Sequence, residues 1–183
     1  MARKETLRKN GDFSFLRNGD VCIHEEKGNM TREPWLMLET RRNQEPTKTL
    51  CWGITNNGAA FARIGTQEGD LVNGFVHEDP YKGRQLGSFI YFKEGDKYFT
   101  DCWYPVLHDD QKLTTTYSFG CVTRETSYIG LDVKTQCFIP DEYDAMVQLV
   151  TVKPKPFIMA QVSQFMQVFT LSPSMGQCRF SSG

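Results

Sequence analysis

Three histidines stand beside acidic residues, a combination that can serve metal binding or proton transfer. His24, His77 and His108 are each followed by two carboxylate residues. Imidazole and carboxylate groups together bind divalent ions, and they can also act as general acid and base. Such a site requires ligands that converge in space, which the spacing of these three runs does not indicate. We therefore interpret them as polar turns with locally paired histidines, and the sequence predicts no metal site.

Acidic residues could instead supply the two carboxylates of a glycosidase, which must be held about 5–10 Å apart across the glycosidic bond. The candidates are Asp101, Asp109, Asp110, Asp141 and Glu142. Because carboxylates in turns are mostly solvated, we assign no catalytic residue, and a small glycoside hydrolase remains an alternative. No Gly-rich phosphate loop opens a helix and no Gly-x-Ser-x-Gly motif is present, so no cofactor is expected.

Aromatic side chains offer a third kind of chemistry, because their flat faces can stack on the apolar faces of sugar rings. The candidates are Trp35, Trp52, Tyr91, Trp103 and Tyr104. In a β-rich chain most of them are expected to fill the core. Trp103 and Tyr104 are adjacent, so one of them points outward if they lie in a strand. We predict Trp103, Tyr104 and Trp35 as the carbohydrate-binding residues.

Composition excludes other classes of partner. The chain has 183 residues, enough for one domain, and its formal net charge of −1 gives no basic field for nucleic acid. No apolar run approaches the ~20 residues of a membrane helix, and the N-terminal residues lack the apolar core of a secretory signal. We therefore expect a cytoplasmic protein that binds no membrane. The six cysteines form no Cys-x-x-Cys pair and are interpreted as buried free thiols, although their even number also permits disulfides.

The elements that must position these residues are short strands. Asn18-Gly19 separates two alternating segments, which is typical of a hairpin, and Gly58 and Gly95 mark further turns. Strands are expected at 88–93, 97–104, 113–121, 123–128, 131–139 and 145–152. No apolar helical period occurs before residue 156. The pattern predicts an all-β, antiparallel sandwich.

The charge pattern divides the chain into three segments. Residues 1–9 are a basic leader, 10–156 form the β-sandwich domain, and 157–183 form a divergent or truncated tail. In the tail, Arg179 is the only charged residue. The stretch 157–171 is compatible with one long strand or with a marginal helix.

Two segments carry a resemblance to a known family. Segment 87–106 contains Ile90-Tyr91, a turn, an aromatic-rich strand and a closing Pro105-Val106. Segment 118–144 follows with a Gly-containing strand, the dipeptide Ile129-Gly130, and a strand that ends in an aromatic-aliphatic-Pro sequence before acidic residues. In this order the elements resemble the N-terminal domain of the cellobiose/chitobiose phosphorylase family, which is glycoside hydrolase family 94 and was formerly glycosyltransferase family 36. Segments 10–13, 32–35 and 52–58 fall where that family has comparable elements.

The resemblance runs from about residue 10 to residue 152 and departs at 99–102, where the family more often has a Trp-containing turn. It implies a galactose-mutarotase-like supersandwich, incomplete at its C-terminus. It also implies a non-catalytic domain of an enzyme that performs inverting phosphorolysis of β-glucosides. The implied partners are a β-linked glucoside or oligosaccharide, a missing helical-barrel catalytic domain and a second copy of the chain. A free-standing carbohydrate-binding module remains an alternative, and this chain alone is expected to be inactive.

Overall fold

The computed structural model is built from antiparallel strands joined by turns. The structure describes residues 6–10, 13–25, 36–39, 49–56, 58, 60–64, 89–102, 106, 108–141, 143, 145–154, 166–170 and 179–181. All strand pairs among these residues are antiparallel. The predicted all-β sandwich is therefore confirmed. No helix in this part of the chain is long and apolar enough to span a membrane.

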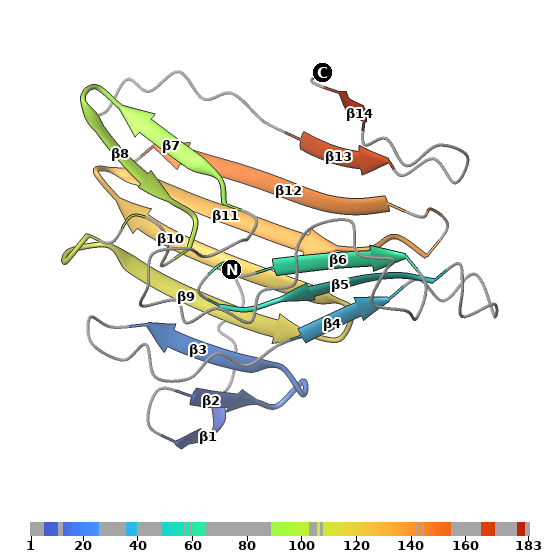
Figure 1. Ribbon diagram of the computed structural model, residues 1–183. Coiled ribbons are helices and arrows are strands. Elements are labelled where there is room, and N and C mark those ends of the chain that lie inside the picture. The colour runs from blue at the N-terminus through green and yellow to red at the C-terminus, as the bar shows by residue number, and fades with distance from the viewer. Residues whose placement is uncertain are drawn as a thin grey trace.

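The first layer is a sheet of nine strands (Figure 1). In spatial order its strands are β1 (Thr6–Asn10), β2 (Phe13–Leu16), β3 (Val21–Glu25), β9 (Lys112–Ser118), β10 (Cys121–Tyr128), β11 (Leu131–Phe138), β12 (Ala145–Pro154), β13 (Met166–Thr170) and β14 (Arg179–Ser181). The chain leaves this sheet after β3 and returns to it at β9. β1 begins within the predicted leader, and β13 and β14 come from the predicted tail.

The excursion between β3 and β9 builds the second layer, which lies over one face of the large sheet in Figure 1. It consists of two separate pieces. The three-stranded piece contains β4 (Leu36–Glu39), β5 (Leu50–Ile54) and β6 (Ala60–Ile64). The two-stranded piece is the hairpin of β7 (Tyr91–Glu94) and β8 (Lys97–Thr100).

Each piece of the second layer has its own apolar core against the large sheet. Trp52 and Leu38 of the three-stranded piece pack with Val122 and Cys137 of the large sheet. Phe99 of the β7–β8 hairpin is fully buried against a second cluster that includes Val133. Phe99 lies 5.1 Å from the ring of Phe92 and 5.6 Å from that of Tyr128, between ring centroids. Both pieces are therefore held on the sheet chiefly by apolar burial.

Alternation along the strands decides which side chains face this core. Along β11, Leu131, Val133 and Cys137 are buried, whereas Asp132 on the opposite side is exposed. This alternation of buried and exposed side chains, with a period of two residues, indicates a sheet with one covered face. On β10 the inward positions include Val122, Arg124 and Thr126, so the same register directs an arginine into the core.

The structure corrects two strand boundaries. The strand predicted at 97–104 ends at Thr100 as β8, and residues 101 and 102 form a bend. The sequence predicts strands at 113–121 and 123–128, but β9 ends at Ser118 and the chain turns at Phe119 and Gly120. Gly120 has a φ of 76°, a left-handed conformation that glycine adopts without the steric cost of a Cβ. The prediction was wrong because Phe119 continues the run of β-forming residues, while its side chain is in fact 86% exposed.

Two other predicted turns are confirmed. Asn18 and Gly19 close the β2–β3 hairpin, where the Leu16 and Asp20 backbones are hydrogen bonded and Gly19 has a φ of 89°. The turn after β5 brings Gly58 against the end of β8. A Cβ built on Gly58 would lie 2.5 Å from Sγ of Cys102 and 2.6 Å from the Phe89 ring. Glycine at 58 thus allows the two pieces of the second layer to meet.

Candidate functional site

The two pieces of the second layer and the large sheet meet at a buried ion pair. Nη1 of Arg124, on β10, lies 3.3 Å from Oδ2 of Asp101, which follows β8, and both side chains are almost fully buried. Nη2 of Arg124 donates to the Thr55 carbonyl oxygen, just after β5, at 3.3 Å. One guanidinium group therefore joins all three sheets.

Asp101 is held by its side chain and by its backbone, and both form hydrogen bonds with Ile90. Its Oδ1 accepts a hydrogen bond from the Ile90 backbone N–H at 3.1 Å, and its own N–H donates to the Ile90 carbonyl oxygen at 3.2 Å. These bonds clamp the residue that precedes β7. Because its carboxylate also contacts Arg124, Asp101 has a structural role and is not positioned as a solvent-facing acid or base.

The charge of Arg124 is retained despite its burial. Burial alone disfavours the charged guanidinium, but Asp101 and weaker interactions with nearby groups outweigh that effect, and the net pKa of Arg124 is raised above its usual value. The arginine therefore stays positive at any pH at which the protein is folded. A group that keeps its charge does not exchange protons, so Arg124 is not suited to act as a general acid or base.

Polar side chains surround the ion pair. Thr115 on β9 and Thr135 on β11 are the direct cross-strand neighbours of Arg124, and both are fully buried. Buried Gln111 donates from Nε2 to the Thr100 carbonyl oxygen at 2.8 Å and to Oγ1 of Thr126 at 3.0 Å. Among the described residues, Oε1 of Gln111 and Oγ1 of Thr135 have no hydrogen-bond partner, so this polar centre is only partly satisfied.

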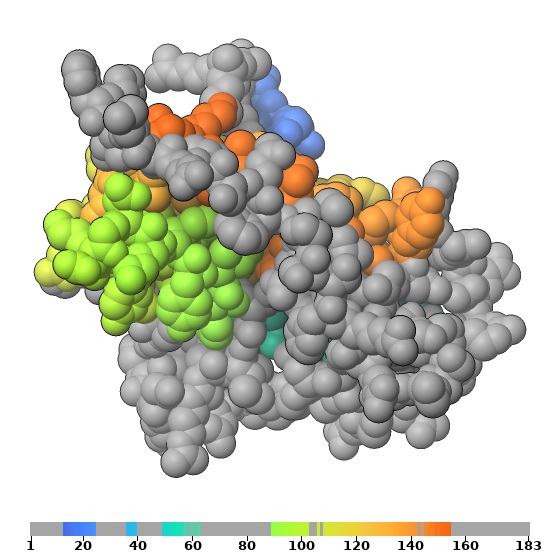
Figure 2. Space-filling model, turned by 90° about the horizontal axis from the view of Figure 1, so that it is seen from above, coloured from blue at the N-terminus to red at the C-terminus, as the bar shows by residue number. Residues whose placement is uncertain are grey.

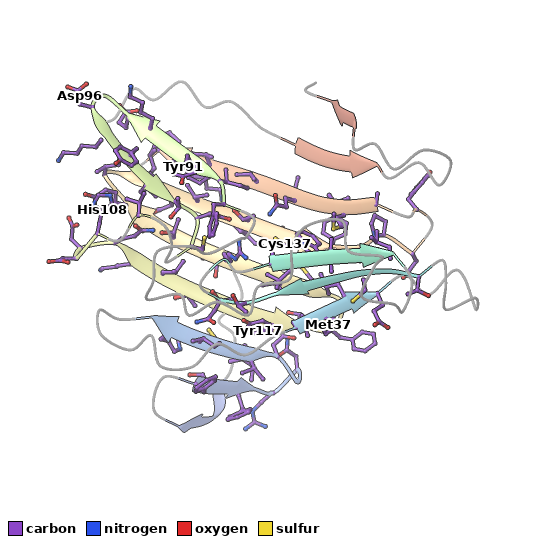
Figure 3. The ribbon with its side chains drawn as sticks, in the orientation of Figure 1. Met37, Tyr91, Asp96, His108, Tyr117 and Cys137 are labelled. Carbon is purple, nitrogen blue, oxygen red and sulfur yellow. The ribbon has the colours of Figure 1, made fainter. Side chains whose placement is uncertain are left out.

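A second cluster lies at the end of the sheet, where β10 turns into β11. The ring of His108 stacks on Tyr128 with centroids 4.3 Å apart, and its Nε2 lies 2.7 Å from the Tyr98 carbonyl oxygen. Desolvation and the nearby Asp110 carboxylate raise the pKa of Tyr128, so its phenol stays protonated at neutral pH. Figure 3 shows His108 at the same end of the molecule as Tyr91 and the hairpin tip at Asp96.

The sequence model of the glycosyl hydrolase 94 supersandwich domain matches residues 22–155, well over half of the chain. The chain belongs to the glycosyl hydrolase 94 family. The matched segment runs from β3 to the end of β12 and includes both Asp101 and Arg124. No curated protein matches the chain.

The predicted sugar-stacking residues of this supersandwich domain fall into three groups. Trp35, Trp103 and Tyr104 lie outside the described residues. Trp52 is only 3% exposed and packs in the core, as expected for most of the aromatic candidates. Tyr91 is 57% exposed on the β7–β8 hairpin, and so is available for stacking.

The candidate carboxylates do not converge where the supersandwich domain is described. Asp101 is buried, and Asp109 and Asp110 are exposed before β9. Asp141 is exposed in the turn between β11 and β12, which the strand register places at the opposite end of the sheet. Glu142 lies outside the described residues. The acids that can be located therefore form no pair across a common cleft.

The histidines of the supersandwich domain occupy different settings. His24 is an exposed residue of β3, with its Nε2 3.1 Å from Oγ of Ser14 on the neighbouring strand, and so the expectation of a polar turn was wrong for it. His108 pairs with Tyr98 and Tyr128, and His77 lies outside the described residues. Within the described part of the chain, no three His, Cys, Asp or Glu residues are grouped so that they could hold a metal ion.

Exposed aromatic residues occur at both ends of the supersandwich domain. Tyr91 and Tyr98 share the outward face of the β7–β8 hairpin, where Tyr98 directly opposes Lys93. Figure 2 shows this hairpin at the molecular surface. At the other end, Phe119 and Tyr143 are 86% and 64% exposed in the turns that follow β9 and β11.

The Arg124–Asp101 pair was not predicted from the sequence. The available signal was the position of Arg124 in the same alternating register as Val122 and Thr126. A charged residue on the apolar side of a strand requires a buried partner. Which acid serves as that partner depends on tertiary packing.

Proposed function

We propose that this chain is a non-catalytic domain of a glycoside phosphorylase, with a structural and carbohydrate-binding role. In the complete enzyme the reaction would be inverting phosphorolysis of β-glucosides to a sugar 1-phosphate. The observation that carries the proposal is the family match over 22–155. The buried charged residues Arg124 and Asp101 of this fold are paired with each other. The dispersed positions of Asp101, Asp110 and Asp141 further support a domain without its own reaction centre.

The proposed partners are a helical-barrel catalytic domain and a second copy of the chain. The exposed rings of Phe119 and Tyr143 support such a contact, because large apolar side chains that gather at one end of a domain often mark an interface. The strand register brings both turns to the same end of the sheet. We place the structural interface of the domain at this end.

The proposed carbohydrate ligand is a β-linked glucoside or oligosaccharide, with Trp103, Tyr104 and Trp35 as its contacts. Tyr91 and Tyr98 are exposed and form an aromatic surface on the β7–β8 hairpin. This surface favours the alternative of a free-standing carbohydrate-binding module. Aromatic faces combine apolar contact with a polar group at the ring edge, which suits sugar rings.

We also propose a cytoplasmic location. Cys22, Cys51, Cys102, Cys121 and Cys137 are reduced thiols that form no disulfide bond. Free cysteines are typical of reducing compartments.

Two measurements test the proposed function. The purified 183-residue chain is incubated with cellobiose and inorganic phosphate, and release of glucose 1-phosphate is measured; we expect none. Sustained release would overturn the non-catalytic assignment. Separately, cellobiose and chitobiose are titrated into the chain by calorimetry. Binding should weaken in Trp103→Ala and Tyr104→Ala and stay unchanged in Tyr143→Ala, the matched control. Absence of binding to the unaltered chain would overturn the carbohydrate-binding role.

A further inference from the structure

An open cavity of about 170 Å³ lies at the end of the β10–β11 hairpin. It is lined by Asp110, Lys112, Ser127, Tyr128, Ile129 and Gly130. Sites for drug-sized ligands usually measure roughly 300–1,000 Å³, so this cavity suits a smaller molecule. Its residues differ from Trp35, Trp103 and Tyr104, the contacts proposed above.

One wall of the cavity is a fixed aromatic ring. Tyr128 is held on one side by the nearly parallel ring of His108, at an interplanar angle of 14°, and on another by the edge-on ring of Phe99. His108 is itself anchored, because its Nε2 donates to the Tyr98 carbonyl oxygen. The orientation of Tyr128 is therefore set before any ligand arrives, which lowers the entropic cost of binding.

The turn that closes the cavity is conformationally unusual. Ile129 has a φ of 41°, a left-handed value that is rare for a β-branched residue, and Gly130 follows with a φ of 77°. The Ile129 side chain packs against the apolar cluster around Phe99 and Leu131, which compensates for the backbone strain. Two consecutive positive φ values are typical of a two-residue hairpin turn, here between the paired residues Tyr128 and Leu131, and this turn fixes the backbone at the cavity.

The polar groups of the cavity carry both signs of charge. Asp110 and Lys112 are exposed on its rim, and the Ser127 hydroxyl donates to Oδ1 of Asp132 at 2.6 Å. An anion would be repelled by Asp110 and a metal ion by Lys112. A neutral ligand with several hydroxyl groups can donate to the carboxylate and accept from the ammonium group at the same time.

We propose that this cavity binds a single sugar ring, with Asp110 and Lys112 holding its hydroxyl groups and Tyr128 forming one wall. The proposal rests on the carbohydrate-binding role proposed above, but it assigns that role to a different site. It also places a sugar next to the β7–β8 hairpin, whose exposed Tyr91 and Tyr98 lie at the same end of the domain.

The test is a titration of the 183-residue chain with D-glucose, followed by ¹H–¹⁵N NMR. We expect the amide signals of Ile129 and Gly130 to shift. Asp110→Asn and Lys112→Met should each weaken binding by about tenfold or more, since each removes a charge-assisted hydrogen bond. The matched control is Asp141→Asn, an exposed carboxylate at the opposite end, which should leave the affinity unchanged.

Several outcomes would overturn the proposal. Glucose-induced shifts that avoid residues 127–130, or unaltered affinity in both cavity variants, would place the sugar elsewhere. A parallel titration with glycine tests a zwitterion, which could also pair with both charges; shifts with glycine and none with glucose would show that the ligand class is wrong. Glucose binding that survives both Asp110→Asn and Lys112→Met, together with cellobiose binding that is lost in Trp103→Ala, would overturn the cavity and leave the proposed function intact.

Discussion

Oδ2 of Asp101 lies 3.3 Å from Nη1 of Arg124 in the interior of the protein, where the three sheets meet. Apolar packing alone would allow a short hairpin to slide along the large sheet. A charged pair that also binds the backbones of Thr55 and Ile90 permits one placement of each piece. We infer that the pair specifies how the second layer docks, a role distinct from simply adding stability.

Removing one partner of this pair should therefore be severe. Asp101→Asn should lower the free energy of unfolding by about 3–5 kcal/mol, because it leaves the guanidinium buried without its counter-charge. Urea unfolding followed by circular dichroism measures the change. The exposed Asp96→Asn at the hairpin tip is the matched control and should change stability by less than about 0.5 kcal/mol.

A double variant separates charge from shape. Asp101→Leu combined with Arg124→Met replaces both charges with apolar groups, and it should recover much of the stability lost in the single variant. If Asp101→Asn were as stable as the unaltered chain, the pair would have no structural role of the kind inferred here.

Much of the fold could be predicted from local sequence, and the central ion pair could not. Strands such as β11 alternate residue by residue, and the turn glycines Gly19 and Gly58 mark hairpins, so nearest-neighbour patterns were sufficient. Asp101 and Arg124 are 23 residues apart, and nothing local indicates that they meet. The turn at Phe119 was missed for a related reason: the propensity of an isolated aromatic residue does not reveal whether it is covered. Trp52 and Tyr91 both lie in strands, but Trp52 faces the core and Tyr91 faces solvent. The local sequence does not show which face of each strand is covered.

Gly58 should tolerate no larger residue. Gly58→Ala should destabilise the protein by about 2–3 kcal/mol, because the φ of 98° disfavours a Cβ and the new atom would overlap Cys102 and Phe89. Gly19→Ala is the matched control: its φ of 89° is similar, but no atom lies within 4 Å, so only the backbone cost of about 1 kcal/mol is expected. Thermal unfolding compares the two, and equal losses would show that the contact with Cys102 and Phe89 is unimportant.

The thiol of Cys137 should make stability fall at alkaline pH. Burial raises the pKa of Cys137 to about 11, despite the opposing effect of Arg124. Between pH 9 and pH 11 the unfolded chain loses this proton while the native chain keeps it, so the native state binds more protons and stability declines as the pH rises. At pH 10.5 the loss from this group should be about 2 kcal/mol relative to pH 8.5.

Comparison of variants isolates the contribution of Cys137 from that of other titrating groups. Urea unfolding at the two pH values should show a smaller decline in Cys137→Ala than in the unaltered chain. Cys121→Ala is the control, because Cys121 is half-buried on the other face of the sheet. An identical decline in all three proteins would contradict the buried, protonated state of Cys137.

Phe99 should determine whether the β7–β8 hairpin stays on the sheet. Its fully buried ring is the centre of the apolar cluster beneath the hairpin, so Phe99→Ala should cost about 3–5 kcal/mol. The neighbouring Tyr98 is 53% exposed, and Tyr98→Ala should cost little by comparison. Hydrogen exchange locates the effect: in Phe99→Ala the amides of 91–100 should lose protection before those of β10 and β11. Equal loss of amide protection in all strands would contradict this prediction. It would mean that the hairpin and the large sheet unfold as one unit, so that Phe99 does not control the hairpin separately.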